Sequence, residues 1–216
     1  RDHVGFVVAT GRTVASANAY LTRHGVSGVD VLITSVGAEI YYGPRLQPSR
    51  SWDAHIAARW EPDRIRRALG DLAYLTYQEE ETQRRFKISY YMDPGKDRLA
   101  AIHNRLRSAK CKYNLIYSHD RYLDILPYRA SKGKAIRFLC YKWEIPLRNV
   151  VVAGDSGNDE EMMRGEPSAI VVANYSPELD VLRKSKHVYF AGQPFAGGIL
   201  EGLRKYRFFE KTKAAQ

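Results

Sequence analysis

The feature that most constrains the fold of this chain is an alternation of short apolar runs with helical stretches. After Ser131 the runs NVVVAGD, SAIVVAN and HVYFA alternate with segments such as KGKAIRFLCYKW and PELDVLRKS. Near the start, HVGFVVATGR precedes TVASANAYLTRHG, whose apolar residues have helical spacing. This alternation is typical of parallel strands joined by helices. It predicts an α/β fold with a doubly wound, mostly parallel, Rossmann-like sheet.

The stretch from residue 46 to residue 128 follows a different pattern. WDAHIAARWEPDRIRRAL and KDRLAAIHNRLRSA have helical spacing, whereas AYLTYQ, FKISYYM, KYNLIYS and YLDILPY resemble strands. The last two flank His119-Asp120, which predicts a hairpin turn. We therefore expect an inserted α/β cap over residues 46–128, carried by a core formed from residues 1–45 and 129–216.

Composition places the chain among ordinary globular proteins. It has 216 residues, of which 44% are apolar and 27% charged, enough for a sizeable core. No apolar run approaches the roughly 20 residues of a membrane span, and the N-terminal residues do not resemble a signal peptide. Cys111 and Cys140 lack metal or redox spacing, so we expect reduced structural thiols in a cytoplasmic protein.

The formal net charge of +10 raises nucleic acid as a partner. The basic residues, however, are interleaved with acidic ones, as in RWEPDRIRRALGD, and the densest cluster, residues 204–213, has few aromatic neighbours. The charge therefore favours a small anionic ligand over specific nucleic-acid binding. A salt-dependent shift assay would reveal the latter.

Two polar residues stand where such a ligand would bind. Thr10 ends an apolar run beside Gly11, and open α/β sheets bind ligands at that edge. Its hydroxyl is a donor for a phosphate oxygen, and the alternative is a cap of the following helix. Lys132 begins the helix that returns from the cap, where its charge would neutralise a phosphate. The alternatives are a solvated surface lysine, or Lys134 in the same role.

The stretch VVVAGDSGNDEEM drives an apolar strand directly into Asp155 and Asp159. Carboxylate oxygens are ligands that Mg²⁺ prefers, and one or two suffice because the ion keeps several waters. The alternative is a turn aspartate followed by one that complements a helix dipole. The delivery of both carboxylates to a sheet edge favours the metal site.

Taken in order, these segments resemble motifs two, three and four of the haloacid dehalogenase-like phosphohydrolases. The resemblance is closer to the sucrose-phosphate phosphatases, through ATGRT, LITSVGAEIYYG, FKISYYMD, LDILPYRASKGKA, VVAGDSGNDEEM and FAGGILEGL. It covers the chain from about Val4 to Phe209. The phosphatase-like C-terminal domain of sucrose-phosphate synthases is similar too, especially in SYYMDP and RASKGKAIRFL.

The resemblance implies hydrolysis of sucrose 6-phosphate to sucrose and phosphate with Mg²⁺. Asp155 would bind the metal directly, and Asp159 would bind it through water or orient it. Phosphate oxygens would be held by Thr10 and Asn158, with Gly11 beside them and Lys132 neutralising charge. Lys87 matches a lysine that contacts the sugar. Arg12 and Glu39 are weaker substrate-binding candidates, and an exposed salt bridge is the alternative for both.

The first motif of that family, Asp-x-Asp-x-Thr, is not found in residues 1–216. It supplies the nucleophile and the general acid on a strand preceding HVGFVVATGR. We expect such a strand to fill the centre of the sheet, and residues 1–216 not to form a folded core without it. The alternative is a domain that binds a sugar phosphate without turnover and docks on, or regulates, a sucrose-phosphate synthase glycosyltransferase.

Overall fold

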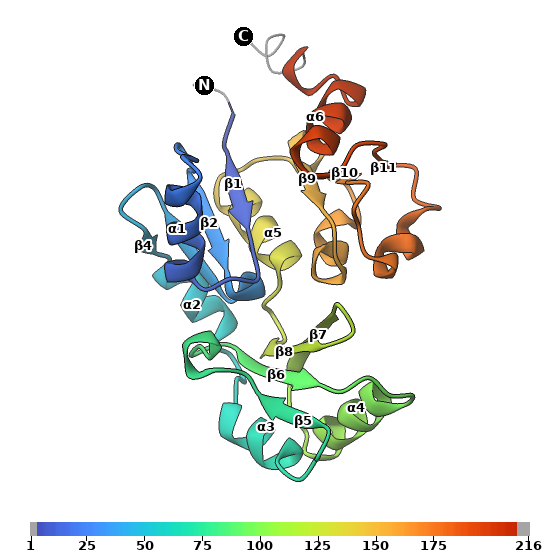
Figure 1. The fold of residues 1–216 in the computed structure, drawn as a ribbon. Helices are drawn as coiled ribbons and strands as arrows, with labels where there is room; N and C mark the ends of the chain where they lie inside the picture. Colours follow the sequence, from blue (N-terminus) through green and yellow to red (C-terminus); the bar gives the residue numbers. More distant parts are fainter. Residues whose placement is uncertain (1–3, 211–216) are drawn as a thin grey trace.

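The computed structural model describes residues 4–210 and divides the core between two sheets (Figure 1). The first sheet has the order β1-β2-β3-β4. Strands β1 (Val7–Ala9) and β2 (Val31–Thr34) are parallel, whereas β3 (Glu39–Tyr42) and β4 (Gln47–Pro48) continue antiparallel. Helix α1 (Val14–Arg23) connects β1 to β2, and the short 3-10 turn η1 (Ser35–Gly37) connects β2 to β3.

The second sheet has the order β11-β10-β9 and is parallel throughout. Its strands are β9 (Val151–Gly154), β10 (Ser168–Val171) and β11 (Val188–Phe190). The expected helices between them are short 3-10 segments, η4 (Gly157–Met163) and η5 (Pro177–Leu182). Helix α6 (Phe195–Lys205) follows β11, and another 3-10 turn, η3 (Leu147–Asn149), precedes β9.

Helix α5 (Lys132–Lys142) connects the two parts of the core. Its Ala135 and Leu139 belong to the apolar cluster around β2 and β3. Its Ile136 packs against that cluster and also against the cluster around β9 and β10. The two sheets therefore share one covering helix although their strands do not pair.

The core does not form the single doubly wound sheet that the sequence predicts. Among residues 4–210, β1 pairs only with β2 and β9 only with β10, so there are two separate sheets. Thr10 N–H donates to Ile33 C=O, so by the alternation of a parallel ladder Val7 and Ala9 direct their backbone groups away from β2. The carbonyls of Val150 and Gly154 accept bonds from the β10 side. The backbone groups of Val151 and Ala153 therefore lie on the open edge of β9.

Burial agrees with these two open edges. Val7 in β1 remains 37% exposed and Phe6 just before it 43%, whereas Ile33 in β2 and Ile170 in β10 are fully buried. In Figure 1, β1 and β9 are the neighbouring strands of the two sheets, and no strand of residues 4–210 lies between them. Two strands that the sequence pattern predicts to be central are therefore edge strands among the described residues.

The cap forms the expected antiparallel sheet, in the order β5-β6-β8-β7. Its strands are β5 (Leu75–Tyr77), β6 (Ile88–Met92), β7 (Tyr113–Ser118) and β8 (Tyr122–Pro127). Helices α3 (Pro62–Leu69) and α4 (Arg98–Ser108) bury their apolar faces against one side of it, and the 3-10 turn η2 (Glu80–Thr82) precedes β6. His119 and Asp120 form the expected turn between β7 and β8, both with positive φ.

The cap begins later than residue 46. Strand β4 pairs with β3, and helix α2 (Arg50–Ile56) buries Trp52 and Ile56 in the core cluster. The single long helix expected here is divided into α2 and α3, because Pro62 cannot continue a helix but suits a first turn.

No helix of residues 4–210 is long and apolar enough to cross a membrane. Both cysteines are free and buried, and burial raises the pKa of each thiol.

Candidate active site

The loop that follows β9 uses its two aspartates in different ways. Asp159 is 3% exposed, and its Oδ2 accepts bonds from the N–H groups of Asp155 (3.1 Å) and Ser156 (3.2 Å). Asp155 is exposed, and no group among residues 4–210 bonds to its carboxylate. Its backbone is fixed on both sides, since its C=O also accepts from Ser176 N–H at 2.7 Å. The carboxylate of Asp159 therefore points inward and bonds to the backbone of the loop, whereas that of Asp155 is exposed.

A glycine is required at the start of this loop. A Cβ on Gly154 would lie 2.5 Å from Cγ of Asp159, because the bracing carboxylate packs directly over the backbone. The Gly-Asp-x-x-x-Asp spacing therefore has a steric origin here. It lets the second aspartate fold back onto the end of the strand that carries the first.

Lys132, the lysine preferred from the sequence, contacts this loop. It is the first residue of α5, whose N-cap is Ser131, and only 5% of it is exposed. Its Nζ donates to Oδ1 of Asp159 at 2.8 Å and to Oδ1 of Asn158. An ammonium has three protons, so one remains for a ligand. Lys134 instead donates to the C=O of Tyr128.

Thr10 is connected to the start of α5 by the turn η1, because Val36 bonds to Thr10 and Gly37 packs against Ser131 and Lys132. Its C=O accepts from Val36 N–H at 3.1 Å, and its Oγ1 accepts from Arg12 N–H at 3.2 Å. The alternative of a helix cap does not apply, because Thr13 caps α1 by accepting from Ser16 N–H. The Thr10 hydroxyl proton therefore remains available to a ligand.

The donor set accommodates a magnesium ion only in part. Among the described residues no group of three His, Cys, Asp or Glu side chains converges as a ready-made metal site. The Asp155 carboxylate fits a direct ligand, since it is exposed and unengaged. Asp159 does not fit one as it stands, because both of its oxygens are occupied by Lys132 and by backbone amides. These contacts favour the orienting role over metal binding through water, and the role of Asp159 stays a prediction.

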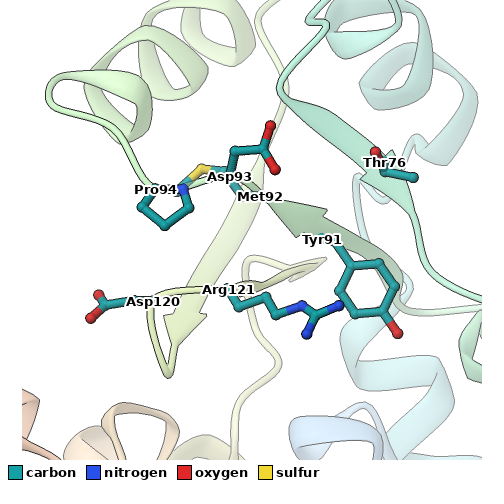
Figure 2. A pocket seen from close by; sticks show the side chains of 7 residues that line it. All are labelled: Thr76, Tyr91, Met92, Asp93, Pro94, Asp120 and Arg121. Carbon is teal, nitrogen blue, oxygen red and sulfur yellow. The ribbon is translucent and has the colours of Figure 1, made fainter.

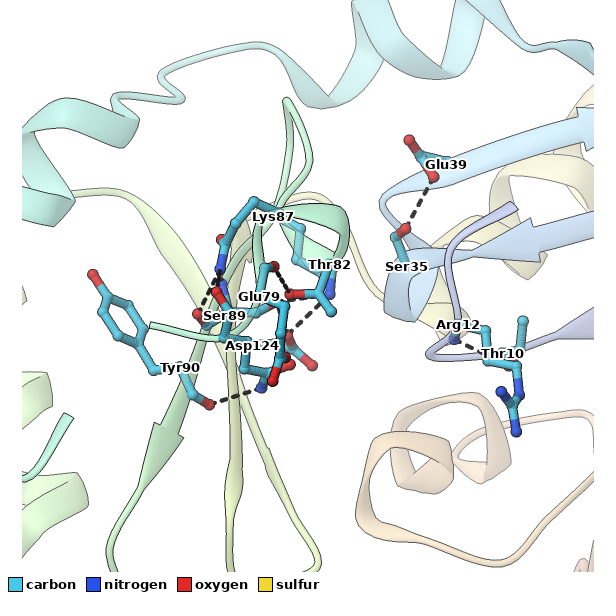
Figure 3. A network of polar contacts seen from close by, with 12 residues as sticks. Thr10, Arg12, Ser35, Glu39, Glu79, Thr82, Lys87, Ser89, Tyr90 and Asp124 are labelled. Atoms are coloured by element: carbon cyan, nitrogen blue, oxygen red, sulfur yellow. Dashed lines mark hydrogen bonds and ion pairs between the residues drawn. The ribbon is translucent and has the colours of Figure 1, made fainter. Parts of the chain in front are cut away.

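In the cap, Lys87 is almost fully buried in a polar cluster (Figure 3). Its Nζ donates to Ser89 Oγ at 2.7 Å and lies 3.4 Å from Asp124 Oδ1. Ser89 Oγ in turn donates to that oxygen at 2.6 Å. This sheet face is opposite the one that α3 and α4 cover, because Ile88 and Tyr90 pack into the apolar cluster beneath those helices.

Glu39 and Arg12 occupy different surroundings. Glu39 Oε2 accepts from Thr34 Oγ1 and Ser35 Oγ, and its Oε1 lies 3.4 Å from Nε of Arg84 in the cap. The pair is partly buried and joins the cap to the core, so the salt-bridge alternative describes it best. The Arg12 guanidinium stacks on the Tyr20 ring and donates to Ser16 Oγ, both in α1, while the Arg12 C=O accepts from Ser35 N–H. Gly11 has no close neighbour except a Val36 methyl.

A shallow cavity of about 430 Å³ lies in the cap and is drawn in Figure 2. Tyr91 and Arg121 form one wall, with the guanidinium 4.7 Å from the ring centroid. None of the catalytic, metal-binding or substrate-binding candidates expected from the sequence lines this cavity, although the SYYMDP segment contributes Tyr91, Met92, Asp93 and Pro94 to it. Tyr91 nevertheless follows Lys87 and Ser89 on the same strand face, so the cavity continues the polar cluster along β6.

Sequence reasoning missed three residues of this arrangement. Ser89 and Asp124 complete the cluster around Lys87, and Glu178 accepts from Gly157 N–H beside the Asp155 loop. A polar residue at alternate positions of an apolar strand is a usable signal for the first two, as in FKIS and YLDIL. Glu178 lies in a short segment whose sequence gives no such signal.

Residues 1–207 match the profile of the sucrose-6F-phosphate phosphohydrolase family. Sucrose-phosphatase 1 of Nicotiana tabacum is 30% identical over 98% of this chain and 52% of its own length. The mannosylfructose-phosphate phosphatase of Agrobacterium fabrum is 31% identical over 93% of this chain and 82% of its own. The chain thus spans about half the length of the tobacco protein.

Two solved structures place the fold. The sucrose-phosphatase of Synechocystis, solved with sucrose and phosphate, superposes with a TM-score of 0.88 at 27% identity, covering 94% of this chain and 84% of that one. A sugar phosphatase of haloacid dehalogenase subclass IIB superposes with a TM-score of 0.68 at 14% identity, covering 95% and 86%. The second likeness shows the fold alone.

Proposed function

This chain belongs to the sucrose-6F-phosphate phosphohydrolase family, and from that membership we propose that it forms the phosphate-binding and sugar-binding parts of a magnesium-dependent sucrose 6-phosphate phosphatase. The observation that carries the proposal is the difference between the two aspartates that follow β9. The buried ammonium of Lys132 is braced by Asp159, while the carboxylate of Asp155 stays free beside it.

These groups fit a phosphate monoester. Lys132 offers its third proton to a phosphate oxygen, and the Thr10 hydroxyl offers another donor from the end of β1. Asp155 would hold Mg²⁺, which when bound would neutralise charge on the phosphate oxygens. Preorganised donors of this kind stabilise the charge that develops during phosphoryl transfer.

The cap cluster fits a sugar. Lys87 gives two of its three protons to Ser89 and Asp124, which leaves one donor. Oδ2 of Asp124 accepts no bond within residues 4–210, which leaves an acceptor beside it. A paired donor and acceptor suit neighbouring hydroxyls of a glycosyl unit, so we place sugar recognition there.

The nucleophile in this scheme would come from an Asp-x-Asp strand between β1 and β9. Parallel strands direct their carboxyl ends to one edge. A strand paired with both open edges would end between Thr10 and Asp155. Its first aspartate would attack phosphorus, and the second would protonate the leaving sugar oxygen.

The test uses an extended protein, defined as residues 1–216 preceded by a strand and helix that carry Asp-x-Asp. With Mg²⁺ it should release phosphate from sucrose 6-phosphate. Lys132→Met should lower the rate by about 10²-fold or more, whereas the matched Lys134→Met should change it little. Equal losses in the two variants would contradict the proposed site.

A second candidate function is binding without turnover, as a domain that docks on or regulates a glycosyltransferase. In that case the extended protein would bind sucrose 6-phosphate in calorimetry and release no phosphate. A panel that includes mannosylfructose phosphate distinguishes the sugar, because the relative that acts on it is as similar as the tobacco sucrose-phosphatase.

A further inference from the structure

Glu178 connects the cap to the loop that carries Asp155. Its Oε2 accepts from Gly157 N–H at 2.7 Å, inside that loop. Its Oε1 accepts from His119 N–H at 3.0 Å, at the tip of the β7–β8 hairpin of the cap. One carboxylate thus holds two backbone amides that are 38 positions apart in the sequence (157 minus 119) and belong to different parts of the fold.

The local geometry is built around this carboxylate. A Cβ on Gly157 would lie 2.6 Å from Oε2 of Glu178, so the glycine lets the carboxylate reach the backbone. Ser176, two residues earlier in the chain, donates its N–H to the C=O of Asp155. Segment 176–178 therefore bonds to the Asp155 loop twice, and β7 lies against η4 in the same region.

The contact on the cap side is made at a tight turn. His119 and Asp120 both have positive φ, at 52° and 51°, as the two central residues of a type I′ hairpin turn do, and the His119 N–H donates to Glu178. Both bonds are charge-assisted, the stronger kind of hydrogen bond. If the cap moves away, the His119 bond breaks, and Glu178 is held to the Asp155 loop by Gly157 alone.

From this arrangement we propose that Glu178 is a positioning residue that couples cap closure to the order of the Asp155 loop. With the cap closed, the carboxylate is fixed from both sides and the loop is held in place. With the cap open, the loop loses one restraint. The contacts themselves do not depend on the proposed function. Their use does: closing the cap over a substrate would order the loop that is proposed to bind the metal.

Amide exchange of Gly157 tests the coupling without turnover. In Glu178→Ala the exchange rate of the Gly157 amide should rise by about tenfold or more, since one charge-assisted bond is lost. Asp180→Ala is the matched control, because Asp180 lies in the same segment but bonds only to Tyr175 and Arg183. An unchanged rate in Glu178→Ala, or an equal rise in Asp180→Ala, would overturn the proposal.

A second pair of variants perturbs only the cap side. His119→Pro removes the donor N–H and also disturbs the turn, because proline cannot adopt a φ of 52°, while Glu178 stays intact; His119→Gly keeps the N–H and tolerates the positive φ. The Gly157 amide should exchange faster in His119→Pro than in His119→Gly. Equal rates would mean that the two bonds are independent, and the proposal would fail.

Mg²⁺ affinity, measured by calorimetry with the metal alone, separates this inference from the proposed function. If Glu178→Ala weakens Mg²⁺ binding and Asp180→Ala does not, the coupling extends to the metal. If the exchange results hold but the unsubstituted extended protein binds no Mg²⁺, the coupling stands and the proposed function fails.

Discussion

Placing an apolar parallel strand between β1 and β9 is expected to protect a specific set of amides and to make the core unfold as one unit. Val7 and Ala9 on one side, and Val151 and Ala153 on the other, each direct one N–H and one C=O toward the open edges. These four residues leave eight backbone groups without a partner strand. The alternate residues of β1 and β9 bond within their own sheets and serve as internal controls.

The size of the effect follows from these groups. At a net contribution of about 1 kcal/mol for each hydrogen bond, eight bonds are worth about 8 kcal/mol. Fixing a strand of about five residues costs about 1–2 kcal/mol per residue, or about 5–10 kcal/mol. Hydrogen bonding therefore roughly balances the ordering cost. The net stabilisation must come from apolar burial, including that of Phe6 and Val7, which are 43% and 37% exposed.

The assay is hydrogen exchange with urea unfolding, in residues 1–216 and in the extended protein. In residues 1–216 the amides of Val7, Ala9, Val151 and Ala153 should exchange rapidly, while that of Val8 is protected. The two parts of the core should then unfold in separate transitions. In the extended protein all of these amides should be protected, with one cooperative transition. A matched strand of polar residues should fail to do this. Protection of the four amides in residues 1–216 alone, with one monomeric cooperative transition, would refute the reasoning.

Four further outcomes are expected in the extended protein. Asp155→Asn should weaken Mg²⁺ binding in calorimetry by about tenfold or more, because an amide oxygen replaces the one free carboxylate of the loop; unchanged affinity would remove Asp155 from the site. Lys87→Ala should reduce turnover of sucrose 6-phosphate by about ten- to hundredfold but spare a small phosphate ester; equal losses would place Lys87 elsewhere. Burial, aided by a nearby guanidinium, lowers the pKa of His103, so the unfolded chain binds its proton first as pH falls below about 6.5. Stability should therefore decline on acidification through that range, and His103→Gln should make the decline in urea midpoints shallower. Gly37→Ala should cost about 1–3 kcal/mol more than Gly43→Ala in urea unfolding, because both have positive φ but only the first Cβ would collide, 2.1 Å from the backbone of Ser131.

The residues that the sequence located are those placed by a strand end. Thr10 and Asp155 each follow an apolar run beside a glycine, and parallel strands bring such ends to one edge of a core. Lys132 was predicted because it stands at the start of a helix, and a helix start, like a strand end, can be recognised from neighbouring residues alone. Lys132 was preferred to Lys134 because it lies nearer the start of the helix, and in the structure Lys132 bonds to Asp159 whereas Lys134 donates to the C=O of Tyr128.

The residues that the sequence did not locate depend on contacts between distant segments. Ser89 and Asp124 lie directly opposite each other in the β6–β8 register, which neither strand specifies alone. Glu178 acts through backbone amides, which leave no trace in sequence. The open edges of β1 and β9 agree with the expectation of a further strand at the centre of the sheet, because each edge presents backbone groups that such a strand would pair.

The turn η1 explains how Thr10 and Lys132, the proposed phosphate donors, stay connected although the two sheets do not pair. Val36 N–H donates to the C=O of Thr10 at the end of β1. Gly37, with φ of 97°, packs its backbone against Ser131 and Lys132 so closely that no Cβ would fit. Lys132 in turn donates to Asp159, which lies after the carboxyl end of β9 in the other sheet. Val36 itself has φ of 60°, a strained value for a β-branched residue that persists only where surrounding contacts fix it. The strain therefore lies in the turn that connects Thr10 to Lys132, and this turn fixes the spacing of the two proposed phosphate donors independently of what occupies the space between β1 and β9.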